Sequence, residues 1–394
     1  MRRILIIGGG AAGFFSAIQC KTENPDAQVI LADKASAVLA KVKISGGGRC
    51  NVTHACFDPR DLSGFYPRGG KALIGPFHTF QPRDTMDWFE SHGVPLKIEP
   101  DGRVFPVSNS SQSIVDCLCN TAESLGVQIW TGCGINTLDK TDDHFIAYLA
   151  DGKSHSFDRI ILATGSSRPG YALAEKLGHT IVTPVPSLFT FTIQDLLLRE
   201  LAGLSVQKAK VLITGIPKLV QEGPILITHW GLSGPAIIRL SAWAARELSA
   251  RSYQFEIKIS WINAENTLST NSKKLVSGDC PFQEIPSRLW RYLVQKSGIS
   301  VEARWCDLSV KSVKNLEETL QNDSYQVSGK GVFKEEFVTA GGISLKEVNF
   351  KTMESTICPG LHFAGEILDV DGITGGFNFQ NAWTTGYLAG SRVL

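Results

Sequence analysis

The stretch RILIIGGGAAGFFSAIQC (residues 3–20) decides the fold of this chain, because it predicts a buried strand, a glycine turn and a helix. Gly8, Gly10 and Gly13 fill a GxGxxG pattern. The first glycine of this pattern makes the tight turn, the second admits a pyrophosphate and the third lets helix and strand pack closely. The next predicted strand, QVILADK, carries Asp33 near its end, at the spacing of an acid that holds ribose hydroxyls. Together these features predict a dinucleotide site.

The residues around this turn complete the predicted nucleotide site. Ala11 and Ala12 begin the helix, and Lys34 follows the ribose acid. The phosphates are expected on the unpaired N–H groups at the start of the helix, where the helix dipole favours anions. The pattern does not separate NAD from FAD.

Length and composition limit the classes of protein. At 394 residues, the chain is long enough for two or three domains. Hydrophobic residues make up 43% and charged residues 20%, which is ordinary for a soluble globular protein. The net charge of +1 gives no compositional support for nucleic acid as the main partner, although a local basic patch stays open.

Cysteine usage and the N-terminus predict a cytoplasmic protein. The nine cysteines are odd in number, irregularly spaced and without a CxxC pair, which favours reduced thiols and predicts no metal site. The first 20 residues could form a signal peptide, but three glycines interrupt the apolar run, so a buried strand is favoured. No later stretch has the roughly 20 uninterrupted apolar residues of a membrane span, so no membrane association is expected.

A second glycine run, KISGGGRCNVTH (43–54), follows soon after the ribose acid and favours FAD over NAD. A flat ring can lie against backbone only where side chains are absent, which explains why glycine is used despite its entropy cost. Backbone N–H groups of such a loop can reach flavin N5 or phosphate oxygens. Arg49 can pair through its planar fork with a phosphate or an anionic substrate.

The segment SGGGRCN (45–51), preceded by Lys41, resembles the signature of the aminoacetone oxidase-like family of NAD(P)/FAD-dependent oxidoreductases. Three further blocks, at 99–118, 228–243 and 338–390, resemble the same family. The resemblance implies non-covalent FAD. NAD(P)H is a possible donor that would visit the flavin transiently, or not at all. It also implies cofactor contacts along this loop, at Lys41, Ser45, Gly46, Gly47, Gly48, Arg49, Cys50 and Asn51.

The sequence departs from the family pattern at two places. His54 stands where the family usually has asparagine, and the loop ATGSSRPGYALAEKLGH (163–179) is shorter than its family counterpart. In the family that loop lies near the cofactor, so the departure puts its local substrate contacts in doubt.

The C-terminal segment LHFAGEILDVDGITGGFNFQNAW predicts a second half of the flavin site. A strand ends at Gly365 and Glu366, where related flavoproteins place an acid that accepts hydrogen bonds from ribityl or ribose hydroxyls. Asp369 and Asp371 are either ligands or simple turn formers. The N–H groups of the following helix are expected to face the flavin and to stabilise its reduced, anionic form. The residues expected there are Gly376, Phe377, Asn378 and Gln380, although Gln380 and Asn381 could instead cap the helix.

Two further strands are expected in the cofactor domain. VQIWTGCGINTL (127–138) predicts one strand, whose Ile135 matches a position that often touches adenine. FDRIILATGS predicts a buried strand that ends at Ala163, Thr164 and Gly165, beside the cofactor. Between them, HFIAYLADGKSHSF alternates around a DG turn and predicts a hairpin.

The middle of the chain predicts a β-barrel with a helical insertion. Short β-like runs separated by turns fill 189–262, whereas 263–322 shows helical spacing, with Trp290, Leu293 and Val294 expected in the core. The predicted fold class is α/β: a glutathione-reductase-type, Rossmann-like FAD domain with an inserted barrel. The domains are 1–188 with 340–394, 189–262 with 323–339, and 263–322. The substrate is expected where the FAD domain and the barrel meet.

Three functions are open at this stage. The first is an FAD-dependent oxidoreductase that moves hydride between a small molecule and flavin N5, as an amine oxidase or with NAD(P)H. The second is a flavin-dependent reductase of a ribosomal RNA base, and the third a non-catalytic redox module. Catalytic groups are not identified; Arg49, Asn51 and His229 are candidates, although His229 and Trp230 could equally be core or surface residues. Cys50 is expected to be a packed small residue rather than a redox thiol. Oligomeric state is not readable.

Overall fold

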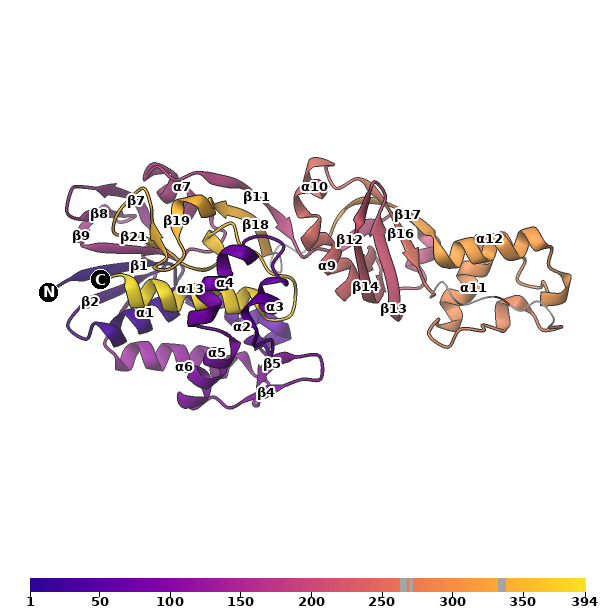
Figure 1. Ribbon diagram of the computed structural model, residues 1–394, viewed down its shortest axis with the longest axis horizontal. Coiled ribbons are helices and arrows are strands. Elements are labelled where there is room, and N and C mark those ends of the chain that lie inside the picture. Colours follow the sequence, from indigo (N-terminus) through magenta and orange to yellow (C-terminus); the bar gives the residue numbers. More distant parts are fainter. Residues whose placement is uncertain (263–267, 269–271, 332–337) are drawn as a thin grey trace. The chain divides into compact units, whose positions relative to one another are not determined.

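The computed structural model describes residues 1–262, 268, 272–331 and 338–394. Its contacts divide the chain into two compact units, which Figure 1 shows as ribbons. We call Met1–Pro184 with Thr339–Leu394 the two-segment unit, and Val185–Val338 the barrel unit. The finer predicted division of the second unit into a barrel and a helical insertion stays a prediction, and part of 263–322 lies outside the described residues.

A seven-stranded sheet forms the centre of the two-segment unit. Five neighbouring strands of this sheet run parallel, and two antiparallel strands extend one edge. This architecture, together with the barrel described below, confirms the predicted α/β, Rossmann-like class with an inserted barrel. The strands, in spatial order, are β19 (Val348–Asn349), β20 (Glu354–Ser355), β21 (Leu361–Phe363), β10 (Arg159–Leu162), β1 (Arg3–Ile7), β2 (Gln28–Ala32) and β6 (Gln128–Trp130).

Helices α1 (Ala11–Glu23) and α13 (Phe377–Arg392) pack against each other at backbone distance. A Cβ built on Gly386 would lie 2.8 Å from the Ala12 carbonyl oxygen, and one built on Gly390 would lie 2.4 Å from that of Ser16. Both contacts advance by four residues on each helix, so the two helices run in the same direction. Figure 1 shows α13, in yellow, beside α1.

Two smaller sheets complete the two-segment unit, and one of them corrects a prediction. The order β3-β5-β4 joins Thr53–His54, Arg103–Pro106 and Leu96–Ile98, and the order β7-β8-β9 joins Ile135–Lys140, Phe145–Leu149 and Ser154–Phe157. The hairpin expected between 144 and 157 is confirmed as β8 and β9. The single strand predicted at 127–138 is wrong, because a turn through Gly132 at φ +63° separates β6 from β7 and sends them into different sheets.

The two-segment unit also contains further helices, two 3-10 turns and one small sheet. The helices are α2 (Ala40–Gly48), α3 (Pro59–Ser63), α4 (Gly70–Thr79), α5 (Pro82–Ser91), α6 (Ser111–Ser124), α7 (Arg168–Lys176), and the 3-10 turns η3 (Leu345–Glu347) and η4 (Gly365–Ile367). Strands β11 (Ile181–Ser187) and β18 (Val338–Ile343) pair in a two-stranded sheet. Each of them contains one of the two points at which the chain passes from one unit to the other.

A closed six-stranded barrel forms the centre of the barrel unit, and the predicted barrel is therefore confirmed. Its strands are, in order around the barrel, β12 (Phe191–Ile193), β15 (Gly231–Ser233), β14 (Ile216–Thr228), β13 (Ser205–Ile213), β16 (Phe255–Ser260) and β17 (Asp323–Lys330). Inward-facing residues alternate with exposed ones, as in β17, because successive side chains of a strand point to opposite faces.

Helices of the barrel unit share one hydrophobic core with the strands. Pro235 occupies the first turn of α9, where its missing N–H costs nothing. Trp290, Leu293 and Val294 are buried in this core, which confirms their expected structural role. The helices are α8 (Leu196–Arg199), α9 (Pro235–Trp243), α10 (Ala245–Ala250), α11 (Ser287–Lys296), α12 (Val310–Gln321), and the 3-10 turns η1 (Val276–Gly278) and η2 (Trp305–Asp307).

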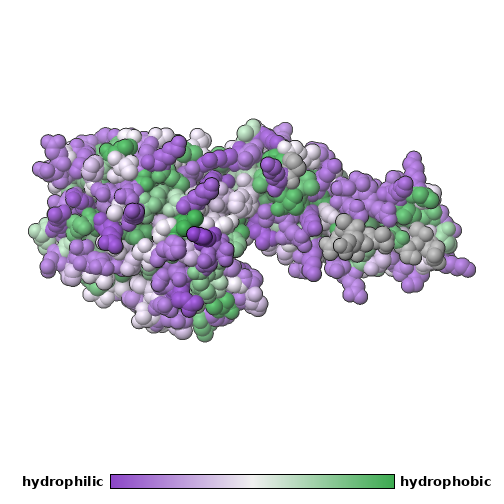
Figure 2. Space-filling model, in the orientation of Figure 1, coloured by the Kyte–Doolittle hydropathy of each residue, from purple (hydrophilic) through white to green (hydrophobic). Residues whose placement is uncertain are grey.

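The surface is mainly polar on the face drawn in Figure 2, with hydrophobic side chains gathered in smaller areas. Several large apolar side chains are nevertheless exposed, among them Leu196 at 76% and Trp230 at 57%. Among the described residues, no helix combines the length and apolar character that crossing a bilayer requires.

The close contact between α1 and α13 predicts that Gly390→Ala destabilises the protein. The added methyl group would sit 2.4 Å from the Ser16 carbonyl oxygen, which only a separation of the helices relieves, at a cost of about 1–3 kcal/mol. Gly75→Ala in α4 is the matched control, because a Cβ there meets nothing within 4 Å. Thermal unfolding should show a lower midpoint for the first variant only; equal midpoints would contradict the assigned packing.

Candidate functional site

The glycine turn between β1 and α1 lies against the carboxylate of Asp33. The Gly9 N–H donates to Asp33 Oδ2 over 2.6 Å, and the Ala35 N–H donates to Oδ1 over 2.7 Å. Each carboxylate oxygen keeps a lone pair, so Asp33 is held in place and can still accept a ribose hydroxyl. Lys34 is exposed beside it.

Segments that are far apart in sequence surround this turn. A Cβ on Gly13 would lie 1.8 Å from the Gly8 carbonyl oxygen, which is the close approach expected of the third glycine. Ala163 and Thr164 lie directly against Gly8. Cys133 donates its N–H to the Asp33 carbonyl over 2.8 Å, which brings the start of β7, and with it Ile135, to the same edge.

The SGGGRCN segment begins at the C-terminal end of α2 and continues beyond it, and its backbone leaves the helical conformation at Ser45, which agrees with the loop that the sequence predicts. The assigned helix is interrupted, because Ser45 is extended and Gly46 and Gly47 are left-handed. Gly48 is also left-handed, at φ +81°. Three consecutive residues with positive φ explain the glycine run, since side chains with a Cβ rarely adopt this conformation. The segment presents bare, exposed backbone.

Arg49 already has partners inside the protein. Its Nη1 donates to Glu99 Oε1 over 2.8 Å, and its guanidinium lies 4.0 Å from the Phe105 ring centroid. The second oxygen of Glu99 pairs with Arg103 over 3.2 Å. Glu99, Arg103 and Phe105 belong to the second block of family resemblance, so this block holds Arg49 in position. Its remaining N–H groups stay available for a ligand.

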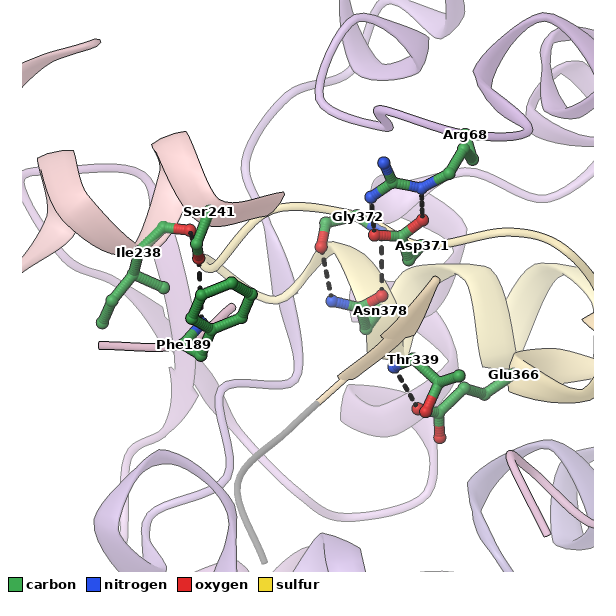
Figure 3. A network of polar contacts seen from close by, with 9 residues as sticks. All are labelled: Arg68, Phe189, Ile238, Ser241, Thr339, Glu366, Asp371, Gly372 and Asn378. Atoms are coloured by element: carbon green, nitrogen blue, oxygen red, sulfur yellow. Dashed lines mark hydrogen bonds and ion pairs between the residues drawn. The ribbon is translucent and has the colours of Figure 1, made fainter. Parts of the chain in front are cut away.

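Glu366 follows β21 and lies beside Lys41. The Lys41 Nζ is 2.8 Å from Glu366 Oε2, and the Thr339 N–H donates to Oε1 over 3.2 Å. Figure 3 shows the contact with Thr339. A Cβ on Gly165 would lie 3.5 Å from Glu366 Oε2. The structure therefore brings Lys41, Gly165 and Glu366 together, as the predicted cofactor contacts require.

The start of α13 is an uncapped helix N-terminus. Gly376, at φ +96°, precedes Phe377, no side chain caps the helix, and the first turn holds no acidic residue. A Cβ on Gly376 would lie 2.5 Å from the Thr53 carbonyl oxygen, so the helix begins directly beside the end of the GGGRCNVT segment. The start of α1 also lacks a side-chain cap and acidic residues. Both ends favour bound negative charge.

The two helix starts are offset along a common direction. Gly386 lies nine residues from the start of α13, and its partner Ala12 lies one residue from the start of α1. At a rise of about 1.5 Å per residue, the α13 start therefore projects about 12 Å beyond that of α1. One positive end adjoins the dinucleotide turn, and the other lies against Thr53, which follows the glycine run in the chain.

The turn before α13 is fastened by a buried ion pair that the sequence did not predict. Arg68 binds both carboxylate oxygens of Asp371, whose side chain is fully buried (Figure 3). Asn378 closes the turn, because its amide exchanges two hydrogen bonds of 2.9 Å with the backbone of Gly372. Asp371 is thus structural, and the side chain of Asn378 holds the turn. Arg68 stands in no motif, which explains why sequence reasoning missed it.

Gln380 lies in the interior rather than at a surface. Its Oε1 accepts from Thr53 over 2.5 Å and from Thr85 over 2.9 Å, and its Nε2 donates to Thr384 over 3.0 Å. The side chain is fully buried and fastens α13 to β3 and α5. The structure thus gives Gln380 a positioning role, in place of the direct contact or helix cap considered from sequence.

Cys50 lies within the SGGGRCN segment and His54 follows it. Neither side chain is arranged as a nucleophile or as an acid–base group. Cys50 is fully buried, and burial raises the pKa of its thiol to about 12, so the thiol stays protonated at neutral pH. His54 stacks on Phe377 with ring centroids 4.8 Å apart, and its Nε2 lies 3.2 Å from the Asp101 carbonyl oxygen. Burial lowers the pKa of His54, so its imidazole is neutral near pH 7.

The catalytic candidates divide between the two units. Arg49 and Asn51 lie on the glycine-run segment, and Asn51 carries a buried side-chain oxygen with no hydrogen-bond partner among the described residues. His229 belongs to the barrel unit and is exposed on the turn between β14 and β15. No catalytic role is tested for any of the three, and each stays a prediction.

These residues fit a bound dinucleotide with a flavin ring. Gly10 offers open space, with nothing within 4 Å of a built Cβ. The two uncapped helix starts can stabilise the negative charge of phosphates or of a reduced ring. Asp33 and Glu366 supply acceptors for sugar hydroxyls, and Asn51 supplies an unpaired oxygen. Fold and site together define an enzyme of the FAD-dependent oxidoreductase class.

Comparison with known proteins places the chain within a family. It belongs to the family described as HI0933-like protein Rossmann domain, whose model matches residues 2–392. It is 29% identical to a 3-dehydro-bile acid delta(4,6)-reductase of Clostridium scindens, over 99% of this chain and 98% of that protein. It is also 29% identical to a ribosomal RNA dihydrouridine synthase of Escherichia coli, over 99% and 97% respectively.

Solved structures share the fold at low sequence identity. A 3-ketosteroid delta1-dehydrogenase from Sterolibacterium denitrificans matches with a TM-score of 0.53 at 9% identity, over 100% of this chain and 99% of that one. A flavocytochrome c3 fumarate reductase matches with a TM-score of 0.51 at 16% identity, over 100% and 78% respectively. Because the relatives are enzymes, the non-catalytic redox module is not retained.

The buried pair predicts that Arg68→Met costs about 3–5 kcal/mol of unfolding free energy, because it leaves the Asp371 carboxylate buried without its cation. Arg103→Met is the matched control: its side chain is 40% exposed, so the loss should stay below about 1 kcal/mol. Urea unfolding measures both. A loss for Arg68→Met no larger than that of the control would show that the pair carries little stability.

Proposed function

We propose that this enzyme reduces a carbon–carbon double bond conjugated to a carbonyl group, using non-covalent FAD. The two full-length relatives support this substrate class. A delta(4,6)-reductase of a 3-dehydro bile acid and a dihydrouridine synthase act on different molecules. Each nevertheless saturates a ring double bond in conjugation with a carbonyl, so the shared chemistry is hydride addition to an activated alkene.

The observation that carries the proposal is the uncapped start of α13, which lies against the Thr53 carbonyl at the end of the segment that contains the glycine run. FAD, when bound, supplies hydride chemistry at its ring system. The N–H groups at the α13 start stabilise the negative charge of a reduced ring, and no acidic side chain in the first turn opposes them. Asp33 and Glu366 hold the sugar hydroxyls, and Gly46–Gly48 leave space for a flat ring.

The overall reaction needs a reductant and a proton. Saturating the alkene consumes one hydride and one proton, and NAD(P)H of the transient kind expected from the sequence supplies the hydride and leaves as NAD(P)⁺. Arg49 is our candidate for binding the substrate oxygen, because Glu99 and Phe105 hold its guanidinium while several of its N–H groups remain available.

Ribosomal RNA is the second candidate substrate, because two relatives are ribosomal RNA dihydrouridine synthases, from Escherichia coli and Haemophilus influenzae. Charge gives this candidate modest support. The barrel unit has 18 lysines and arginines against 15 acidic residues, a net charge of +3, whereas the two-segment unit is at −2. The amine-oxidase alternative stays a prediction that neither relative favours.

The proposal predicts two colour changes in the absence of oxygen. NADH or NADPH should bleach the flavin absorbance of the holoenzyme, and a cyclic enone such as a 3-oxo-Δ4 steroid should restore it. A saturated 3-oxo steroid is the matched control, because it lacks the alkene. Bleaching by small amines, with no recovery on adding any enone, would replace the proposal by the oxidase alternative.

Ribosomal RNA binding is tested by its salt dependence. If RNA is the substrate, the dissociation constant for a ribosomal RNA fragment should rise steeply between 50 and 200 mM salt, since each neutralised phosphate releases counterions. Uridine-containing RNA should then restore the absorbance of the reduced enzyme, whereas RNA in which uridine is replaced by dihydrouridine should not. Weak binding that does not change with salt would exclude this candidate.

A further inference from the structure

Tyr171, in the first turn of α7, has a buried hydroxyl group without a partner. The residue is 6% exposed, and its hydroxyl oxygen makes no hydrogen bond to any described residue. Thr164, at the end of β10, carries a second hydroxyl of the same kind. Other buried tyrosines are paired: Tyr66 donates to the Phe377 carbonyl over 2.6 Å, and Tyr325 donates to Asp323 over 2.5 Å.

An unpaired buried hydroxyl group is costly. Its desolvation costs about 1–3 kcal/mol unless another group supplies a hydrogen bond, so such groups are rare in folded proteins. Two of them, Thr164 and Tyr171, lie within eight residues of one segment, which points to a ligand that both hydroxyl groups bind.

Thr164 lies beside the dinucleotide turn, and Tyr171 directly follows a residue that the Thr164 hydroxyl contacts. The backbone of Thr164 is in contact with Gly8, the first glycine of the nucleotide turn, since a Cβ on Gly8 would lie 2.9 Å from Thr164 Cα. The Thr164 hydroxyl also lies against Gly170, the residue before Tyr171. Gly165, next along the chain, adjoins the carboxylate of Glu366.

The charges around Tyr171 keep it a hydrogen-bond donor. Burial raises its pKa, and the nearby carboxylates of Glu366 and Asp369 raise it further, because each disfavours a phenolate. The hydroxyl therefore keeps its proton under all ordinary conditions. A neutral phenol beside a carboxylate suits the oxygen-rich sugar and phosphate part of a dinucleotide better than it suits an apolar ring.

We propose that the hydroxyl groups of Tyr171 and Thr164 complete the cofactor site, each forming a hydrogen bond with an oxygen of the sugar–phosphate part of FAD. This inference rests on the proposed use of FAD. It adds Tyr171 to the site and assigns a hydrogen-bonding atom to Thr164, which the sequence already predicts beside the cofactor. It explains why both hydroxyl groups lack a partner among the described residues.

The test compares FAD affinity with the stability of the FAD-free protein. Tyr171→Phe and Thr164→Val should each raise the dissociation constant for FAD about fivefold to tenfold, measured by quenching of flavin fluorescence. The thermal midpoint of the FAD-free protein should stay unchanged or rise, because each change removes an unpaired hydroxyl group. If either hydroxyl group were merely structural, its removal would lower the thermal midpoint of the FAD-free protein and leave the dissociation constant for FAD unchanged.

Tyr66→Phe is the control for the stability measurement, because the Tyr66 hydroxyl is paired with the Phe377 carbonyl. Its FAD-free midpoint should fall. Unchanged FAD affinity in both Tyr171→Phe and Thr164→Val would overturn the inference and leave the proposed function intact. If the wild-type protein itself took up no FAD, both the inference and the proposed function would be overturned.

Discussion

The site depends on the parallel contact between α1 and α13, where Gly386 and Gly390 let the backbones meet. Two parallel helix dipoles place like partial charges at the same end, which is unfavourable unless negative charge binds there. The register of the contact offsets the two helix starts by about 12 Å, so one adjoins the dinucleotide turn and the other lies against Thr53, which follows the glycine run in the chain. Any change that slides one helix along the other would move both anion-binding ends relative to each other.

Most polar residues of the C-terminal block hold this helix rather than a ligand. Asp371 is neutralised by Arg68, Asn378 ties the turn to Gly372, and Gln380 is saturated by threonines. A helix start can stabilise charge in a ligand only if it cannot shift, because preorganised dipoles need no rearrangement during the reaction. The block is therefore better understood as scaffolding for backbone N–H groups. The same holds for Glu99 and Phe105, which restrain Arg49.

Local patterns predicted most strands and the positions of the bare backbone. The buried runs at β1, β2 and β10, the hairpin β8–β9 and the barrel strands β12, β13, β14 and β16 follow from apolar spacing and turn residues. The split between β6 and β7 was missed, because apolar residues continue across Gly132 and only its left-handed turn separates the strands. Arg68 was missed because no linear pattern shows that its partner Asp371 lies some 300 residues away. Tyr171 was missed because no linear pattern shows that a buried hydroxyl group lacks a partner.

The sequence by itself determined the class of fold, the glycine turn with its acid, and the segments that are expected to carry the flavin site. These features are local: glycine, β-branched and apolar residues act through backbone sterics and burial within a few positions. Only the tertiary structure decided which polar side chains are used in hydrogen bonds and ion pairs within the protein, and which remain available to bind a ligand. Arg49, Asp371 and Gln380 look equally suited to a ligand in the sequence, yet each has partners on distant segments. Pairing is a property of three-dimensional neighbours, because a hydrogen bond or an ion pair acts over a few ångströms of space, whatever the separation along the chain.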